Sequence, residues 1–271
     1  MEAADLLMPT LLAIEVETRE RCVVDLNADG AYSNVLKGCV VKSVEYAVFC
    51  RNLGTGMHAF FVAPVLRSIC EDFIALRYLQ AKRTPPERDD LLKNKLMSLV
   101  LDGAAKQHKF FQNRRPFQPV FSGQPKSALP KASLPPTRNM AVDVGLEDLY
   151  DFMYAITSDV VHFNPRVIIR NAWGETQKRF QHSVGNFDIY YADLCQTYSL
   201  FFLCEFARAF SLELSFSREY LTNIGKLEEW LTEKLRWPEA VTFEEMNIDG
   251  PAEVLRLLMK IAAKPSGGEV A

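Results

Sequence analysis

Apolar residues recur at three- and four-residue spacing along most of this chain, which is the period of one face of an α-helix. The alternation typical of strands appears only weakly, at residues 166–170 and 240–243. The pattern therefore predicts an all-α helical bundle of about seven to eight helices, with at most a short β-hairpin. We expect helices near residues 2–21, 31–52, 63–82, 86–111, 144–163, 187–214, 217–236 and 250–263.

Several residues mark where these helices begin. Pro64 suits the first turn of a helix, and Pro85 and Pro86 separate two helices. Asp143 and Asn186 have side chains that favour the N-cap position.

One segment interrupts the helical pattern. Residues 112–140 contain six prolines among serine, lysine and glycine, which predicts a long exposed loop. A solvated connector, a lid, an arm for a protein partner and a nucleic-acid arm all fit this composition. The loop carries the basic residues Arg114, Arg115, Lys126, Lys131 and Arg138.

The predicted loop separates two groups of helices along the chain. Residues 1–111 supply the N-terminal helices of a single helical domain, and residues 141–215 supply its central helices. Residues 216–271 form a C-terminal helical extension. A chain of 271 residues with 48% hydrophobic side chains can bury a large core.

The net charge, the cysteines and the targeting signals indicate in which compartment the protein acts and which partners it can have. A net charge of -3 neither supports nor excludes contact with nucleic acid. The six cysteines form no C-x2-C pair, so we expect buried free thiols in a reducing cytoplasm. The start of the chain lacks the basic residues of a secretory signal, and no uncharged run reaches the roughly 20 residues that span a bilayer. We expect a cytoplasmic protein without membrane contact.

Two helices carry the candidate site. Arg67 and Glu71 lie one turn apart on the first, in the less favourable order for a local ion pair, so we expect partners on another helix. On the second helix Asp151, Ser158 and His162 project in one line. A histidine near a helix C-terminus is stabilised as the cation and can donate or accept a proton near neutral pH. We expect the two helices to fold face to face.

Several kinds of site are disfavoured. A hydrolase triad would need a G-x-S-x-G nucleophile elbow, which the chain lacks. The four histidines are far apart in sequence, and no H-E-x-x-H motif occurs. Neither phosphate-binding glycine motif, G-x-x-x-x-G-K or G-x-G-x-x-G, is present. We therefore expect no cofactor and no metal.

The order of R-x3-E (Arg67, Glu71) and Y-x3-S-x3-H (Tyr154, Ser158, His162) resembles a family of uncharacterised, all-helical bacterial proteins known only as a domain of unknown function. The resemblance covers roughly residues 35–215. That family in turn resembles the HEPN superfamily, whose members are helical, commonly dimeric and often metal-independent ribonucleases in toxin, stress and phage-defence systems. The resemblance to the HEPN superfamily implies that this protein forms a homodimer and has RNA as a partner.

HEPN ribonucleases carry R-x4-6-H on one helix, where arginine and histidine act on the scissile phosphate and the RNA 2′-hydroxyl is the nucleophile. The match in this chain is Arg51 to His58. Gly54 and Gly56 weaken a continuous helix between them, and a match of this length is expected by chance. It is the weaker alternative to the assembled set.

Two functions remain open. In the first, a ribonuclease or toxin-type effector uses His162 as general acid or base and Arg67 to stabilise phosphate charge, while Glu71 and Ser158 orient them. In the second, the same residues form a buried polar network that fixes helix register in a non-catalytic interaction or scaffold protein. An open, positively charged groove would favour the first, and a sealed network the second.

Overall fold

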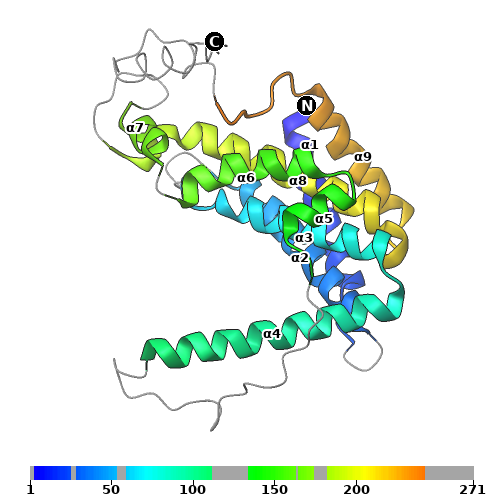
Figure 1. The fold of residues 1–271 in the computed structure, drawn as a ribbon. Helices are drawn as coiled ribbons and strands as arrows, with labels where there is room; N and C mark the ends of the chain where they lie inside the picture. Colours follow the sequence, from blue (N-terminus) through cyan, green and yellow to red (C-terminus); the bar gives the residue numbers. More distant parts are fainter. Residues whose placement is uncertain are drawn as a thin grey trace, which may run out of the picture.

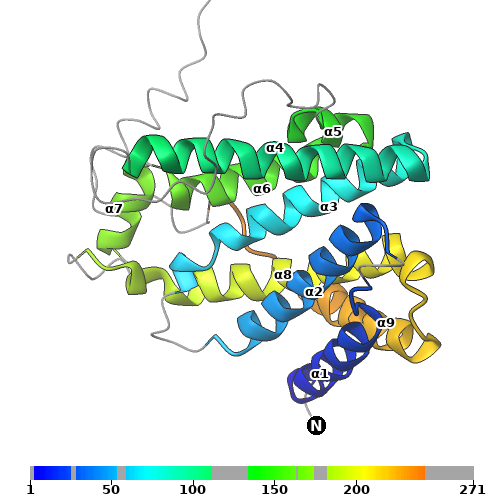
Figure 2. The ribbon, with the colours of Figure 1, turned by 90° about the horizontal axis from the view of Figure 1, so that it is seen from below.

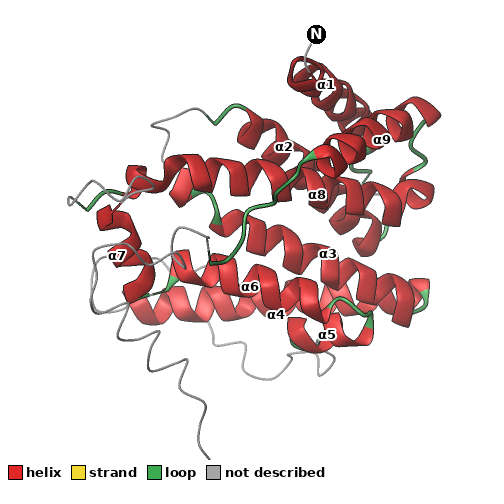
Figure 3. Ribbon diagram, turned by 90° about the horizontal axis from the view of Figure 1, so that it is seen from above, coloured by secondary structure: helices red, strands yellow, loops and turns green. Residues whose placement is uncertain are grey.

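The computed structural model describes residues 3–25, 29–53, 59–111, 134–162, 164–173 and 182–241. In these ranges the chain is all-α, as predicted, and contains no strand (Figure 3). Nine α-helices and two short 3₁₀ helices follow one another in the described residues: α1 (Ala3–Arg21), α2 (Ala31–Arg51), η1 (Ala59–Phe61), α3 (Pro64–Lys82), α4 (Pro85–Phe111), α5 (Thr137–Asp143), α6 (Glu147–Val161), α7 (Pro165–Trp173), η2 (Val184–Phe187), α8 (Asp188–Leu214) and α9 (Arg218–Glu233).

Helix α8 is the centre of the bundle (Figures 1 and 2). Helices α2, α3 and α9 pack against it, α1 bridges α2 and α9, and α5 and α6 cover α3. Buried side chains occupy α8 from Tyr191 to Leu214, on most of its circumference. Helix α8 is therefore a buried core helix.

Aromatic rings join α3 to α8. Phe73 of α3 is 2% exposed, and its ring meets those of Phe202, Phe206 and Phe210 edge-on. The centroid distances are 6.4, 5.2 and 6.3 Å respectively. Edge-to-face pairs add to the free energy gained from burial alone, so this contact fixes how α3 lies on the core.

A tight turn between α8 and α9 anchors α1. Ser215 takes the left-handed conformation at φ 52° and ends α8, and Ser217 caps α9 by accepting a 3.0 Å hydrogen bond from the Tyr220 amide. Glu17 of α1 accepts hydrogen bonds of 2.6 Å from both the backbone amide and the hydroxyl of Ser217. The first and last described helices are thus held together at the turn.

The start of α4 is tied to two other helices. The Arg88 guanidinium donates to the Leu79 carbonyl at 3.0 Å, which caps the end of α3. The adjacent Asp89 carboxylate accepts from the Tyr32 amide at 2.7 Å, in the first turn of α2. Gly30 lies beside it, and a Cβ at this position would crowd the Asp89 carboxylate. The first turn of α4 is therefore firmly placed.

Two regions fold differently from the sequence expectation. Residues 166–170, where weak alternation indicated a strand, belong to α7, in which Val167 is buried. Residues 137–140 of the expected loop form the start of α5, after Pro136. Arg138 is therefore a helical residue, and it forms ion pairs with Glu147 and Asp151 of α6.

Both predicted N-caps are wrong. Asp143 is the last residue of α5, and the N-cap position of α6 is Leu146. Asn186 lies within η2, where its amide donates to the Asn171 carbonyl at 2.7 Å instead of capping α8. Turn and capping residues have the same preferences, so composition did not distinguish them. Pro64 does occupy the first turn of α3, as expected.

Other expectations fall outside the described residues or are not tested by them. The expected loop from 112 to 133, with Arg114, Arg115, Lys126 and Lys131, and the expected helix at 250–263 lie outside. Buried apolar side chains form one continuous cluster from α1 to α9. The division of the chain into N-terminal helices, central helices and a C-terminal extension stays a prediction. All six cysteines are free and five are buried, as expected. None of the described helices is both long enough and apolar enough to cross a membrane.

We expect Phe73→Ala to lower the free energy of unfolding by about 3–5 kcal/mol, because it opens a cavity among the three α8 rings. Chemical denaturation monitored by circular dichroism measures this change. Leu212→Ala, at a 94% exposed position of α8, is the control and should change it by less than about 0.5 kcal/mol. Equal effects of the two substitutions would contradict the central position of α8.

Candidate functional site

The local pair of α3 is present in the structure. Arg67 Nε donates to Glu71 Oε1 at 2.9 Å, one turn further along the helix. Both side chains are partly exposed, at 28% for Arg67 and 37% for Glu71. The hydrogen bond that Arg67 donates to Glu71 raises the pKa of Arg67 above its ordinary value. An exposed pair of this kind contributes only a few tenths of a kcal/mol.

Arg67 also reaches the second helix. Its Nη1 atom donates to Ser158 Oγ at 3.4 Å, across 91 residues of sequence. Its guanidinium carbon lies 4.4 Å from the centre of the Tyr154 ring, in cation–π contact. Helices α3 and α6 therefore pack against each other with these polar groups in contact, as the sequence analysis expected. We refer to Arg67, Glu71, Tyr150, Tyr154 and Ser158 as the Arg67 cluster.

Two tyrosines give the cluster its aromatic side. The rings of Tyr150 and Tyr154 are 5.8 Å apart, on successive turns of α6. Burial raises the pKa of Tyr150 above its ordinary value. The sequence motif includes Tyr154 without assigning it a role, and it does not include Tyr150. The four-residue spacing of two aromatic residues on the face that carries Ser158 is the signal that could have identified them.

His162 does not join the cluster through its side chain. It is exposed and occupies the C-cap position of α6, where its backbone amide donates to the Ser158 carbonyl at 2.9 Å. Within the described part of the chain, no hydrogen bond or ion pair connects the imidazole to Arg67, Glu71 or Ser158. The structure thus brings three of the four expected site residues together and leaves His162 at the edge.

Asp151 is likewise directed elsewhere. It pairs with Arg138 of α5, with 3.3 Å between Arg138 Nε and Asp151 Oδ1. Arg138 also contacts Glu147, so α5 is held to α6 by one arginine between two carboxylates. The polar residues expected to project in one line from α6 therefore contact two different helices. Ser158 contacts α3, and Asp151 contacts α5.

The linear motif is broken by the fold. Helix α2 ends at Arg51, with Asn52 as its C-cap, so Arg51 and His58 do not share one helix. Arg51 Nη1 donates to Gln196 Oε1 of α8 at 3.4 Å. His58 lies outside the described residues.

A second polar group, which sequence reasoning missed, holds the corner between α6 and α7. Arg166 pairs with Asp159 and donates to the Ala240 carbonyl at 3.1 Å. Asn164 also donates to Asp159. Asp159 and Arg166 are separated by the Asn164-Pro165 break, so helical spacing alone did not relate them. These contacts fix the direction in which the chain leaves the Arg67 cluster.

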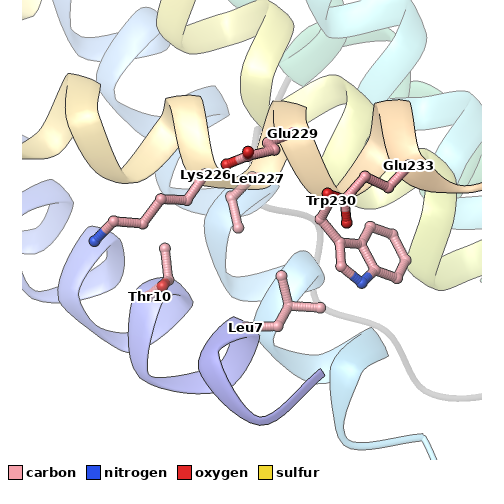
Figure 4. A pocket seen from close by; sticks show the side chains of 7 residues that line it. All are labelled: Leu7, Thr10, Lys226, Leu227, Glu229, Trp230 and Glu233. Carbon is pink, nitrogen blue, oxygen red and sulfur yellow. The ribbon is translucent and has the colours of Figure 1, made fainter. Parts of the chain in front are cut away.

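A pocket of about 250 Å³ lies between α1 and α9 (Figure 4). Leu7 and Thr10 point into it from α1, and Trp230 stands over it from α9. The remaining lining side chains are Lys226, Leu227, Glu229 and Glu233. None of the residues expected to form a site contributes to it. Among the described residues, no group of three or more His, Cys, Asp or Glu side chains could hold a metal ion.

The Arg67 cluster keeps some binding capacity. Within the described residues, Arg67 Nη2 and Glu71 Oε2 make no hydrogen bond to the protein. A guanidinium can bind a phosphate or carboxylate through two nitrogens, and here Nε and Nη1 each donate one hydrogen bond to the protein. The arrangement is therefore chemically suited to join helices, with the remaining N–H groups of Nη1 and Nη2 left for a ligand.

Comparison with known proteins identifies a family but no activity. Residues 35–179 match the model of a family described as "Family of unknown function (DUF5677)". The match covers more than half of the chain and includes both the Arg67 cluster and His162. It confirms the expected likeness to an all-helical family of unknown function, although the expected range reached residue 215. No curated protein and no solved structure matches the chain.

We expect Arg67→Ala to lower the free energy of unfolding by about 1–2 kcal/mol, because the cation–π contact and the bond to Ser158 are both lost. A double-mutant cycle with Tyr154→Leu should give a coupling energy of about 0.5–1 kcal/mol. The control cycle pairs Arg67→Ala with Asp151→Ala, and its coupling should be near zero because Asp151 binds Arg138. Additive effects in the first cycle would contradict the contact between α3 and α6.

Proposed function

We propose that this chain, which belongs to a family of unknown function, is a non-catalytic helical interaction protein in which the Arg67 cluster fixes how α3 and α6 pack. The engagement of Arg67 carries this proposal. Its charge is balanced by Glu71, one face lies over Tyr154, and a second nitrogen bonds Ser158. An arginine that must stabilise a developing phosphate charge needs its donors free at that moment.

The position of His162 supports the same proposal. A general acid or base must lie within hydrogen-bond reach of the groups that it serves. The imidazole is exposed and makes no hydrogen bond to Arg67, Glu71 or Ser158 in the described part of the chain. Removing one partner from a part-buried polar cluster leaves the others poorly satisfied, so such clusters specify packing.

One observation favours a second candidate, a metal-independent ribonuclease of the HEPN kind. Arg67 Nη2 and Glu71 Oε2 remain available, and His162 follows Ser158 by one turn of α6. A phosphodiester bound by the free nitrogen would lie near the end of α6, where a histidine could act as acid or base. In that case the protein would be a toxin-type effector of stress or phage defence in the cytoplasm, with RNA as its substrate.

We expect no cleavage of RNA by the purified full chain above that of a heat-denatured sample. The assay uses a fluorescent single-stranded RNA and total cellular RNA, with EDTA present so that contaminating metal-dependent nucleases are silent. The His162→Ala variant should match the wild-type protein in both assays and in thermal stability.

His182→Ala is the control for this experiment, because His182 is also exposed but lies before η2, away from the end of α6 that carries His162. Cleavage that is lost in His162→Ala and retained in His182→Ala, with unchanged unfolding midpoints, would overturn the non-catalytic proposal and establish the ribonuclease.

A further inference from the structure

Helix α4 is long and poorly covered. It has 27 residues and none of them is buried. Arg88 and Asp89 anchor its first turn, and among the described helices it packs chiefly on α2. Figure 1 shows the rest of the helix extending along the edge of the molecule, well apart from α6. The described helices therefore leave most of α4 uncovered.

An apolar stripe runs along this uncovered part of α4. Leu96, Leu99, Val100 and Phe110 are between 51% and 64% exposed. Together with Gly103 they fall within about 100° of the helix circumference and extend over about 21 Å. We refer to these five residues as the α4 stripe. Apolar residues that recur at this helical spacing are typical of a helix that packs on another helix, and an exposed patch of them marks an interaction site.

Gly103 lies in the middle of the α4 stripe. Inside a helix, glycine is less favourable than alanine, so its presence needs a reason. A Cβ at this position would meet nothing within 4 Å, so packing within the chain does not require glycine here. The missing side chain leaves the backbone of α4 open to close approach by another helix.

Lysines border the α4 stripe on both sides. On a helical wheel, Lys93 lies about 20° beyond one edge of the stripe and Lys95 about 40° beyond the other. Neither ammonium group forms a hydrogen bond or an ion pair within the described part of the chain. Between residues 91 and 111 the one carboxylate, Asp102, is paired with Lys106. The borders of the stripe are therefore positive, and α4 itself supplies no carboxylate that neutralises them.

These features favour a protein helix over a lipid or an RNA surface as the occupant. Gln107 is exposed and projects from the centre of the stripe. A bilayer would bury its amide without a hydrogen-bond partner, whereas a protein helix can supply one. RNA phosphates would bind the lysines and leave the leucines exposed. A helix with an apolar face bordered by aspartate or glutamate satisfies the stripe and both lysines at once.

We propose that the α4 stripe, with Lys93 and Lys95, is the docking surface for an amphipathic helix of a partner protein whose apolar face is bordered by carboxylates. The proposal rests on the interaction role proposed above and states the chemistry of the partner. None of its residues belongs to the Arg67 cluster, so the two are tested separately. Burial of the stripe supplies the apolar centre of the contact, and the lysines select partners by charge.

The probe is a synthetic, fluorescein-labelled helix of about 20 residues, long enough to cover the stripe, with a seam of leucines bordered by glutamates. Fluorescence anisotropy with the full chain at up to about 300 µM should give a dissociation constant of roughly 10–100 µM. A peptide of the same composition, with its leucines spread around the helix, is the control and should not bind.

Leu96→Ala with Leu99→Ala should raise the dissociation constant of the probe at least about tenfold, because two apolar contacts are lost. The matched control, Leu212→Ala with Leu221→Ala, removes two exposed leucines from α8 and α9 and should leave it unchanged.

Gly103→Ala should weaken binding of the probe severalfold without lowering the free energy of unfolding, since the added methyl group has room within the chain. A glycine that served only the fold would give the reverse result, with unchanged binding and lower stability.

A charge reversal at low salt tests the chemistry of the partner. Lys93→Glu with Lys95→Glu should weaken binding of the glutamate peptide about tenfold, and this variant should instead bind the same peptide with lysines in place of the glutamates. Lys109→Glu is the control and should have a much smaller effect, because Lys109 lies on the opposite face of α4.

Absence of probe binding at about 300 µM would overturn the proposal, as would equal binding of the probe and its control peptide. Binding of phosphatidylserine-containing vesicles or single-stranded RNA in place of the probe, lost in Leu96→Ala with Leu99→Ala, would overturn it and assign the surface to that ligand. RNA cleavage that depends on His162 would overturn the non-catalytic proposal, whereas failure of the probe alone would overturn only the docking surface.

Discussion

Helix α8 can be stable only when several other helices cover it, because aromatic and aliphatic side chains occupy most of its circumference. Helices α2, α3 and α9 meet this requirement together, and α1 closes the gap between α2 and α9. The edge-on contacts of Phe73 with three α8 rings then set the orientation of α3. The position of α3 in turn determines where α5 and α6 can pack.

With one face of α3 committed to α8, its other face is left for α6. That second face carries Arg67 and Glu71, so the helix must pack through a polar contact. Tyr154 and Ser158 resolve this by giving the guanidinium an aromatic surface and a hydroxyl. The cluster is therefore explained by helix packing alone, which is why we favour a structural role over a catalytic one. The family match leaves this choice open, because the family itself has no established function.

Helix α4 differs from the other long helices, because none of its residues is buried. Its root is as well determined as any part of the bundle, since Arg88 and Asp89 cap two other helices. Its middle nevertheless presents leucine, methionine and valine to solvent.

The sequence by itself determined the helical class, the approximate extent of most helices and the placement of Arg67 and Glu71 one turn apart on one helix. All of these depend on spacing within a single helix, and a period of 3.6 residues is visible in any window of the chain. Sequence also suggested that α3 and α6 meet. Which groups touch was decided only by the tertiary structure. Tyr154 became the partner of Arg67, Asp151 turned to Arg138, and His162 stayed outside. These outcomes depend on the angle and distance between packed helices, which are set by core side chains far away in sequence.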